Sequence, residues 1–238
     1  MPTATFAARR SQLEAYFDRT AVDAWARLTS DAPVSRIRET VRAGRERMRA
    51  ALLSWLPADM TGRRLLDAGC GTGLLAVEAA RRGADVVAID VSPTLVGLAE
   101  ERLPAGVERK RLHFRVGDML DPELGRFDHV VAMDSLIHYK PADTVRALER
   151  LAERTTGSIL FTFAPRTPLL SAMHTVGQIF PRSDRAPAIE PVSVSALHRD
   201  LARSSALEGW HCGRGERIVS GFYTSQAQEL TRGGLHGS

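Results

Sequence analysis

The chain has 238 residues, of which 44% are hydrophobic and 25% are charged, and its formal net charge is +4. This length suits one domain with an appendage, and the composition is that of an ordinary globular protein. No apolar run approaches the roughly 18 residues of a membrane-spanning helix, and the first ten residues lack the apolar stretch of a secretory signal. The two cysteines, Cys70 and Cys212, lack zinc-ligand spacing and fit a reducing compartment. We therefore expect a cytoplasmic protein without a protein-bound metal.

Two helices are predicted before the first strand. Apolar residues recur at three- and four-residue steps over residues 9–29 and again over residues 35–55, and Asp31-Ala32-Pro33 separates the two helices. We interpret residues 1–60 as an N-terminal helical arm and a lead-in helix, residues 61–231 as the core, and residues 232–238 as a flexible tail.

The second of these helices is basic, with six arginines between Arg36 and Arg49. Such a helix can attract nucleic acid, anionic lipid or an acidic substrate, or it can be a solvated surface. No aromatic residues alternate with these arginines, and this disfavours nucleic acid as a partner.

A glycine-rich turn follows the first predicted strand and precedes a helix over residues 74–82. The turn reads Asp67-Ala68-Gly69-Cys70-Gly71-Thr72-Gly73, and a second strand over residues 84–89 ends in Asp90-Val91. Glycines allow positive φ and close approach of a ligand to the main chain. An acid at the end of the second strand can accept hydrogen bonds from both ribose hydroxyls.

The details of this turn favour S-adenosylmethionine over NAD. A dinucleotide site has the spacing G-x-G-x-x-G around a pyrophosphate, whereas the spacing here is G-x-G-x-G. A carboxylate at Asp67 would repel a pyrophosphate, but it suits the α-ammonium group of a bound amino acid. The remaining alternative is a glycine-rich turn that binds no ligand.

The strand and helix patterns continue to alternate after Asp90. Further strands are expected over residues 113–116, 127–133 and 158–163, and helices over residues 92–103, 142–152, 169–180 and 195–204. Two final strands over residues 216–219 and 222–230 are joined by Ser220-Gly221 and are expected to be antiparallel. The prediction is an α/β, Rossmann-like fold with a mostly parallel seven-stranded sheet and helices on both faces.

Ligands of open α/β sheets bind at the carboxyl ends of the strands. At those ends we expect Asp118 to accept a hydrogen bond from an adenine amino group and the main-chain N–H of Met119 to donate one. Met133 or Asp134 is expected to flank the sulfonium. Asp118 can instead cap a turn, and Met119 can instead pack in the core. The candidate cofactor-binding residues are Asp67, Gly69, Cys70, Gly71, Gly73, Asp90, Val91, Asp118, Met119 and Met133.

The glycine turn and Asp90 resemble those of class I S-adenosylmethionine-dependent methyltransferases, and further segments resemble the magnesium-protoporphyrin IX O-methyltransferase family. These segments are Tyr16-Phe17, Trp25-Ala26-Arg27, Arg42-Ala43-Gly44, residues 136–139, residues 163–167 and residues 176–181. The resemblance implies methyl transfer to a propionate carboxylate of magnesium-protoporphyrin IX in (bacterio)chlorophyll biosynthesis. It also implies contact with magnesium chelatase. From the basic arm and the apolar cleft we expect, at most, a peripheral association with the photosynthetic membrane.

The resemblance also suggests residues on the acceptor side. His138 matches the family's catalytic histidine, which can orient the propionate, remove a proton or contact the central magnesium; packing of its loop is the alternative. The family's arm tyrosine aligns with Thr29, so we expect its role to be reduced or to pass to Tyr16, which would close over the cofactor. Arg42 is expected to pair with the carboxylate of the cofactor or of the substrate, or to be a surface residue. Residues 165–190 would form the acceptor-side wall.

Three other functions remain open from the sequence. The chain can methylate another small molecule, such as a quinone or a natural product, because no residue before Leu136 excludes this. It can be a non-catalytic module that holds a porphyrin or the cofactor for a partner. An NAD-linked oxidoreductase is disfavoured by the glycine spacing.

Overall fold

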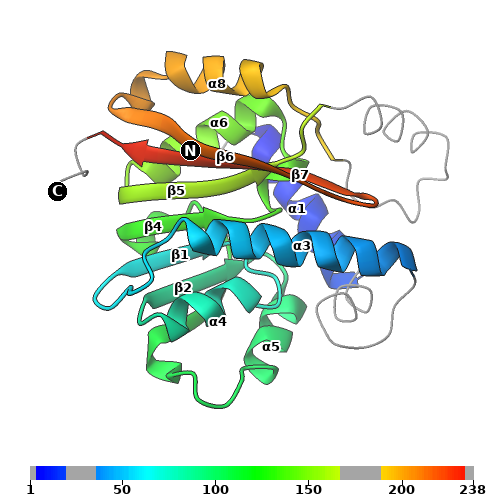
Figure 1. The fold of residues 1–238 in the computed structure, drawn as a ribbon, viewed down its shortest axis with the longest axis vertical. Coiled ribbons are helices and arrows are strands. Elements are labelled where there is room, and N and C mark those ends of the chain that lie inside the picture. The colour runs from blue at the N-terminus through cyan, green and yellow to red at the C-terminus, as the bar shows by residue number, and fades with distance from the viewer. Residues whose placement is uncertain (1–3, 20–35, 167–188, 234–238) are drawn as a thin grey trace.

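The computed structural model describes residues 4–19, 36–166 and 189–233. Its centre is a seven-stranded sheet with the strand order β3-β2-β1-β4-β5-β7-β6 (Figure 1). The strands are β1 (Arg64–Ala68), β2 (Asp85–Asp90), β3 (Leu112–Val116), β4 (Phe127–Ala132), β5 (Thr155–Phe163), β6 (Trp210–Ser220) and β7 (Tyr223–Arg232). The first five strands are parallel, and β7 runs antiparallel to both β5 and β6.

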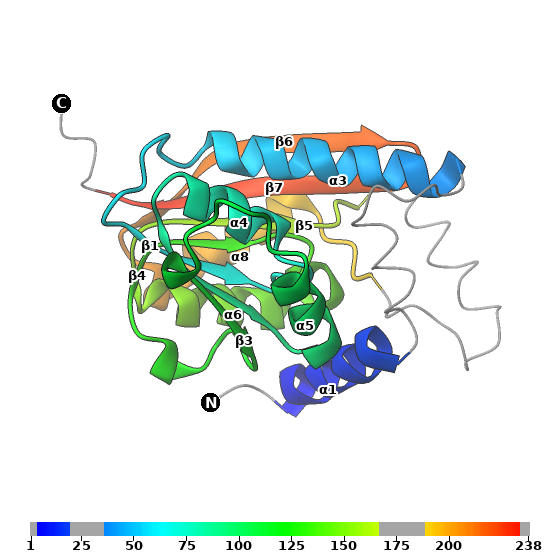
Figure 2. The same ribbon diagram turned by 90° about the horizontal axis from the view of Figure 1, so that it is seen from below.

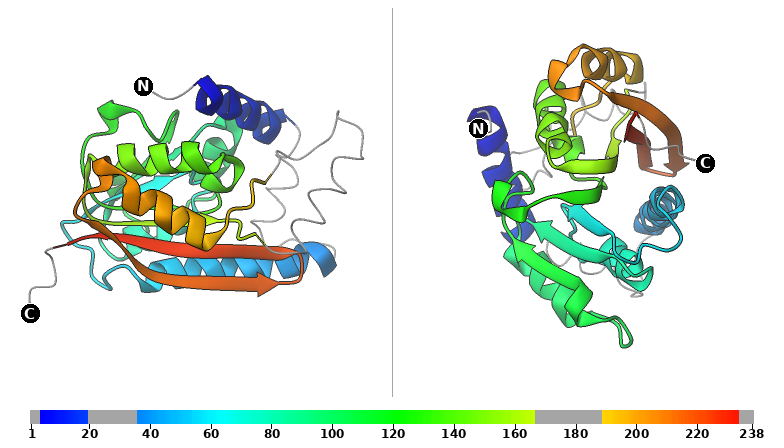
Figure 3. Two further views of the ribbon diagram at one scale, coloured as in Figure 1. Left: turned by 90° about the horizontal axis from the view of Figure 1, so that it is seen from above. Right: turned by 90° about the vertical axis from the view of Figure 1, so that its left-hand side faces the viewer.

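Helices cover both faces of the sheet. They are α1 (Ala4–Arg19), α3 (Arg36–Ser54), α4 (Leu74–Arg81), α5 (Pro93–Glu101), α6 (Pro141–Ala152) and α8 (Val194–Arg203). Buried residues of α1, α6 and α8 belong to the apolar core on one face, and those of α3 and α4 belong to the core on the other (Figure 3). Figure 2 shows α3 running along β6 and β7, with α1 on the far side of the sheet.

Local sequence explains the elements that lead to the carboxyl edge of the sheet. Residues 86–89 of β2 are all buried, as expected for a parallel strand that is covered on both faces. Gly73 takes a φ of 75° at the N-cap of α4. Ser92 caps α5 by accepting a hydrogen bond from the main-chain N–H of Leu95 (3.2 Å), and Pro93 occupies the first turn.

The predicted fold is confirmed, including the antiparallel final pair, but some element boundaries differ. β6 begins at Trp210 rather than at residue 216, because a register shift between Cys212 and Gly215 lets the strand continue past two glycines. α1 begins at Ala4 rather than at residue 9. The predicted helix over residues 169–180, and residues 20–29 of the predicted arm, lie outside the described residues. None of the described helices has the length and apolar character required to cross a membrane.

Candidate active site

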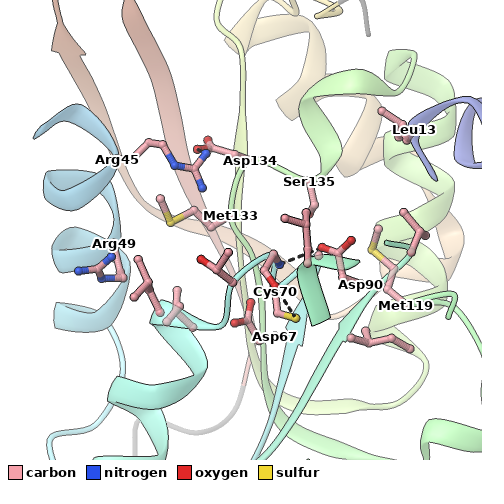
Figure 4. Close-up of a pocket in the computed structure, with 18 of the residues that line it drawn as sticks. Leu13, Arg45, Arg49, Asp67, Cys70, Asp90, Met119, Met133, Asp134 and Ser135 are labelled. Atoms are coloured by element: carbon pink, nitrogen blue, oxygen red, sulfur yellow. Dashed lines mark hydrogen bonds and ion pairs between the residues drawn. The ribbon is translucent and has the colours of Figure 1, made fainter. Parts of the chain in front are cut away.

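A cavity of about 280 Å³ lies at the carboxyl ends of β1, β2 and β4. Its walls come from the glycine turn, from the ends of these strands, from the loop after β3, and from α1 and α3 (Figure 4). The structure therefore brings together most of the residues that the sequence nominated. Those that line the cavity are Arg42, Asp67, Gly69, Cys70, Gly71, Asp90, Val91, Met119, Met133 and His138.

The glycines of the turn have different structural roles. A Cβ at Gly69 (φ 85°) would lie 2.4 Å from Cβ of Ser135, so this glycine lets the turn pack against the loop after β4. A Cβ at Gly73 would lie 2.7 Å from the Phe114 ring, and Gly73 supports α4 without lining the cavity. At Gly71 (φ 53°) a Cβ would meet nothing within 4 Å. The open side of Gly71 is the cavity, where a ligand can approach the main chain.

Asp67 carries a carboxylate that is only 2% exposed, and its Oδ2 atom has no hydrogen-bond partner among the described residues. Burial, reinforced by the nearby charge of Asp90, raises the pKa of Asp67 to about 7. A buried oxygen without a partner is costly, and a bound ammonium group would satisfy both its charge and its hydrogen-bonding capacity. The site thus fits the amino-acid end of S-adenosylmethionine.

Asp90 is held in place by the glycine turn and by the start of α5. Its Oδ2 accepts a hydrogen bond from the main-chain N–H of Gly71 (2.8 Å), and its Oδ1 accepts one from that of Ser92 (3.0 Å). Burial raises the pKa of Asp90 as well. The carboxylate is fixed at the end of β2, in the position where such folds bind ribose hydroxyls.

Cys70 lies between the two aspartates and lines the cavity. Burial, together with the charges of Asp67 and Asp90, raises the pKa of its thiol well above the ordinary value. A raised thiol pKa disfavours the thiolate, and this suits a place in the cavity wall.

Met119 and Asp118 follow β3, but only Met119 lines the cavity. The Oδ2 atom of Asp118 pairs with Nη1 of Arg10 (2.5 Å), and its Oδ1 accepts a hydrogen bond from the main-chain N–H of Leu120 (2.9 Å). Asp118 therefore caps a turn and anchors α1 in this structure. Its contact with adenine remains a prediction, as does that of the Met119 main chain.

The α1 helix lies across the carboxyl edge of the sheet and is held there by side-chain contacts. Phe6 stacks on Tyr139 with ring centroids 4.4 Å apart, and Nε of Arg9 donates to the main-chain oxygen of His138 (2.7 Å). Asp18 accepts hydrogen bonds from the main-chain N–H of Thr94 (3.2 Å) and from its hydroxyl (2.5 Å) at the start of α5. These contacts place α1 against the loops that surround the cavity.

The predicted arm residues are only partly placed by the structure. Leu13 of α1 lines the cavity. Tyr16, one turn later, is half-buried and is not among the lining residues, and burial raises the pKa of its hydroxyl. Thr29 lies outside the described residues.

His138 lies in the short helical turn of residues 136–138 that follows β4. It is 8% exposed and lines the cavity next to Tyr139. The hydrogen bond from Arg9 holds its main chain in place. His138 thus borders the cavity at the end of β4, where the acceptor was expected.

One ion pair in the cavity wall was not predicted. Nη1 of Arg45 in α3 lies 2.6 Å from Oδ2 of Asp134, immediately after β4. The spacing of Arg42, Arg45 and Arg49 by three and four residues was an available signal, because it places all three on one helix face. The partner, 89 residues away, left no local signal.

In the part of the chain that the structure describes, no group of three or more His, Cys, Asp or Glu side chains is arranged to hold a metal ion.

Comparisons with known proteins agree with this fold. The family model described as Magnesium-protoporphyrin IX methyltransferase C-terminus matches residues 132–232, and a general methyltransferase domain matches residues 65–156. The chain is 51% identical to the magnesium-protoporphyrin O-methyltransferase of Rhodobacter capsulatus over 94% of this chain and 97% of that protein. It is 30% identical to the chloroplastic magnesium protoporphyrin IX methyltransferase of Arabidopsis thaliana over 90% of this chain and 68% of that protein.

A solved structure is similar over nearly the whole chain. The magnesium protoporphyrin IX methyltransferase from Synechocystis PCC 6803, crystallised with bound SAH, superposes with a TM-score of 0.81. The two proteins are 26% identical, and the match covers 93% of this chain and 99% of that one. With this fold, this cavity and these relatives, the chain belongs to the magnesium-protoporphyrin O-methyltransferase family.

Proposed function

We propose that the protein transfers a methyl group from S-adenosylmethionine to a propionate carboxylate of magnesium-protoporphyrin IX, giving the monomethyl ester and S-adenosylhomocysteine. The observation that carries this proposal is the 51% identity to the Rhodobacter capsulatus enzyme over 94% of the chain. The acceptor-side half, residues 132–232, matches the porphyrin methyltransferase family. This match favours a porphyrin over a quinone as the acceptor.

The described residues fit the donor. Asp67 would hold its α-ammonium group, Asp90 its ribose hydroxyls and Arg42 its carboxylate, while Val91 and Met119 line the same cavity and Met133 would lie near the sulfur. When bound, S-adenosylmethionine supplies a sulfonium methyl group that a carboxylate oxygen can attack. The chain's task is therefore to bind, to orient and to exclude water.

His138 is our candidate for the acceptor side. An ionised carboxylate is already nucleophilic, so the protein needs no strong base. An imidazole at the end of β4 can donate a hydrogen bond to one oxygen of the propionate and leave the other free to attack. It can also accept a proton from a propionic acid that enters uncharged. The magnesium belongs to the substrate.

The proposal has a direct test. Purified protein is incubated with methyl-labelled S-adenosylmethionine and magnesium-protoporphyrin IX, and the pigments are separated by chromatography. We expect label in the monomethyl ester and none when the diester replaces the free acid. An Asp90→Ala variant should fail to retain the donor, whereas Asp200→Asn, on the exposed side of α8, should behave as wild type. Unlabelled porphyrin with an active donor site would contradict the proposal.

We also propose that the protein contacts magnesium chelatase and rests peripherally on the photosynthetic membrane. The chelatase contact follows from the family resemblance, and the support for the membrane association is electrostatic. The six arginines and two glutamates of α3 give this helix a formal net charge of +4, which equals that of the whole chain. Arg42, Arg45 and Arg49 line the cavity, whereas Arg36, Arg38 and Arg47 are exposed, and these exposed cations favour an anionic surface. Sedimentation with anionic and with neutral vesicles, in low and high salt, tests the membrane association.

A further inference from the structure

The Arg45–Asp134 ion pair is built into the cavity wall with more contacts than a chance surface pair. Asp134 is 5% exposed, and its φ of 54° is the only positive value at a non-glycine position among the described residues. Its Oδ1 atom accepts hydrogen bonds from the hydroxyls of Tyr223 (3.1 Å) and Thr162 (3.2 Å). Its main-chain N–H donates to Oγ1 of Thr162 (2.7 Å). Such a backbone conformation persists only where several contacts maintain it.

The same contacts fix the position of Arg45. A Cβ at Gly44 would lie 2.5 Å from the Tyr223 ring, so α3 approaches the start of β7 as closely as a glycine permits. Arg45 is the next residue, and its guanidinium reaches Asp134 from α3 (Figure 4). It lines the cavity together with Asp134, Met133 and His138. The guanidinium is thus held at the end of β4, in the same cavity that His138 lines.

The charges of the cavity explain why a cation is needed at this place. Four acidic residues line it, Glu46, Asp67, Asp90 and Asp134, together with the three arginines Arg42, Arg45 and Arg49. Arg49 pairs with Glu46, and Arg45 pairs with Asp134. The methyl acceptor is itself a carboxylate, and an unneutralised Asp134 at the end of β4 would repel it. A guanidinium carries five N–H donors in a planar fork, so one group can pair with Asp134 and also receive a second carboxylate.

We propose that Arg45, positioned by Asp134, binds the carboxylate of the methyl acceptor. This inference rests on the proposed function, because it assumes an anionic acceptor. Arg45 is then a substrate-binding residue, and Asp134 is a positioning residue that acts through it. The donor has its own proposed partners at Asp67, Asp90 and Arg42, so loss of Arg45 should affect the acceptor and spare the donor.

The test compares variants of the full-length protein. Arg45→Gln should raise the KM for magnesium-protoporphyrin IX, and its Kd from an absorbance titration, by about tenfold or more. The Kd for S-adenosylhomocysteine should stay within roughly threefold of wild type. Arg45→Lys keeps the charge and should recover part of the loss. Arg47→Gln is the matched control, because Arg47 is an exposed residue of α3 that does not line the cavity.

A second variant covers the case in which Arg45→Gln does not fold. Arg45→Gln with Asp134→Asn removes both charges together, and asparagine tolerates positive φ. The porphyrin Kd of this double variant should lie between those of wild type and Arg45→Gln. The attraction from Arg45 and the repulsion from Asp134 are both lost. A wild-type porphyrin Kd in this double variant, or a larger effect on the donor than on the porphyrin, would overturn the inference. If wild type itself forms no monomethyl ester, the proposed function fails, and this inference fails with it.

Discussion

Replacing Asp67 by asparagine should weaken donor binding and, at the same time, make the ligand-free protein more stable at alkaline pH. The carboxylate is buried and its pKa is raised from 3.8 to about 7. At about 1.4 kcal/mol per pKa unit, the ionised form costs the folded state about 4 kcal/mol above pH 7. An asparagine avoids this cost, but it buries an amide NH₂ group, for which we allow about 1–3 kcal/mol. The net gain at pH 8 is therefore about 1–3 kcal/mol.

The pH dependence of this gain has a definite sign. An unfolded chain ionises Asp67 near 3.8, whereas the folded protein keeps the proton until about pH 7. The folded state binds more protons between these values, so the stability of wild type falls as the pH rises from about 4 to 7 and then levels off. The advantage of Asp67→Asn should grow over the same interval and be complete above pH 7.

Urea unfolding at pH 5 and pH 8 measures the stability difference, and titration calorimetry measures the affinity for S-adenosylhomocysteine. The affinity should fall roughly 10- to 100-fold, because a charged hydrogen bond to the ammonium group is lost. Asp200→Asn, which changes an exposed aspartate, should alter neither quantity. Wild-type affinity in Asp67→Asn, or lower stability than wild type at pH 8, would refute the assignment of Asp67.

Four further substitutions test other parts of the site. Gly71→Ala should weaken donor binding about tenfold in calorimetry, because it strains a φ of 53° and places a methyl group in the cavity. His138→Ala should lower kcat about 100-fold or more while the donor Kd stays unchanged. If turnover and donor affinity fall by the same factor, His138 has a structural role instead. Tyr16→Phe should lower donor affinity and turnover, and unchanged values would end the idea that Tyr16 closes over the donor. Gly44→Ala should lower the free energy of unfolding by about 1–3 kcal/mol, because its Cβ would lie 2.5 Å from Tyr223. Gly97→Ala in α5 is the control for Gly44→Ala in thermal melts. A Cβ at Gly97 meets nothing within 4 Å, so this variant should be more stable than wild type.

The donor half of the site was predictable because its residues are neighbours in sequence. Asp67, the glycine turn and Asp90 belong to one strand–turn–helix–strand unit, so their spacing alone places them at one edge of the sheet. The boundaries of α4 and β2 agree with prediction to within one residue for the same reason.

The contacts that the sequence did not reveal join distant segments. Arg10 pairs with Asp118 across 108 residues, and this pair anchors α1 beside the loop that follows β3. Arg45 pairs with Asp134 across 89 residues. The early start of β6 also depends on a contact between two elements. Glu229 in β7 accepts two hydrogen bonds from the guanidinium of Arg214 in β6. The sequence around Gly213 and Gly215 has no local pattern that predicts a strand.

The charges of the two reactants explain why so many charged side chains line the cavity. Methyl transfer joins a sulfonium cation to a carboxylate anion and leaves a neutral thioether and a neutral ester. Opposite charges disappear along this path, so excluding water favours the transition state over the solvated reactants. The stacking of Phe6 on Tyr139 brings α1 against the loops around the cavity and removes solvent from this region. The methylated propionate has no charge left for Arg45 to bind, so the reaction itself weakens the hold of Arg45 on that group, while the second propionate of the monomethyl ester keeps its charge. A cavity lined by Arg45 and bordered by α1 can thus bind an anionic porphyrin and release its ester.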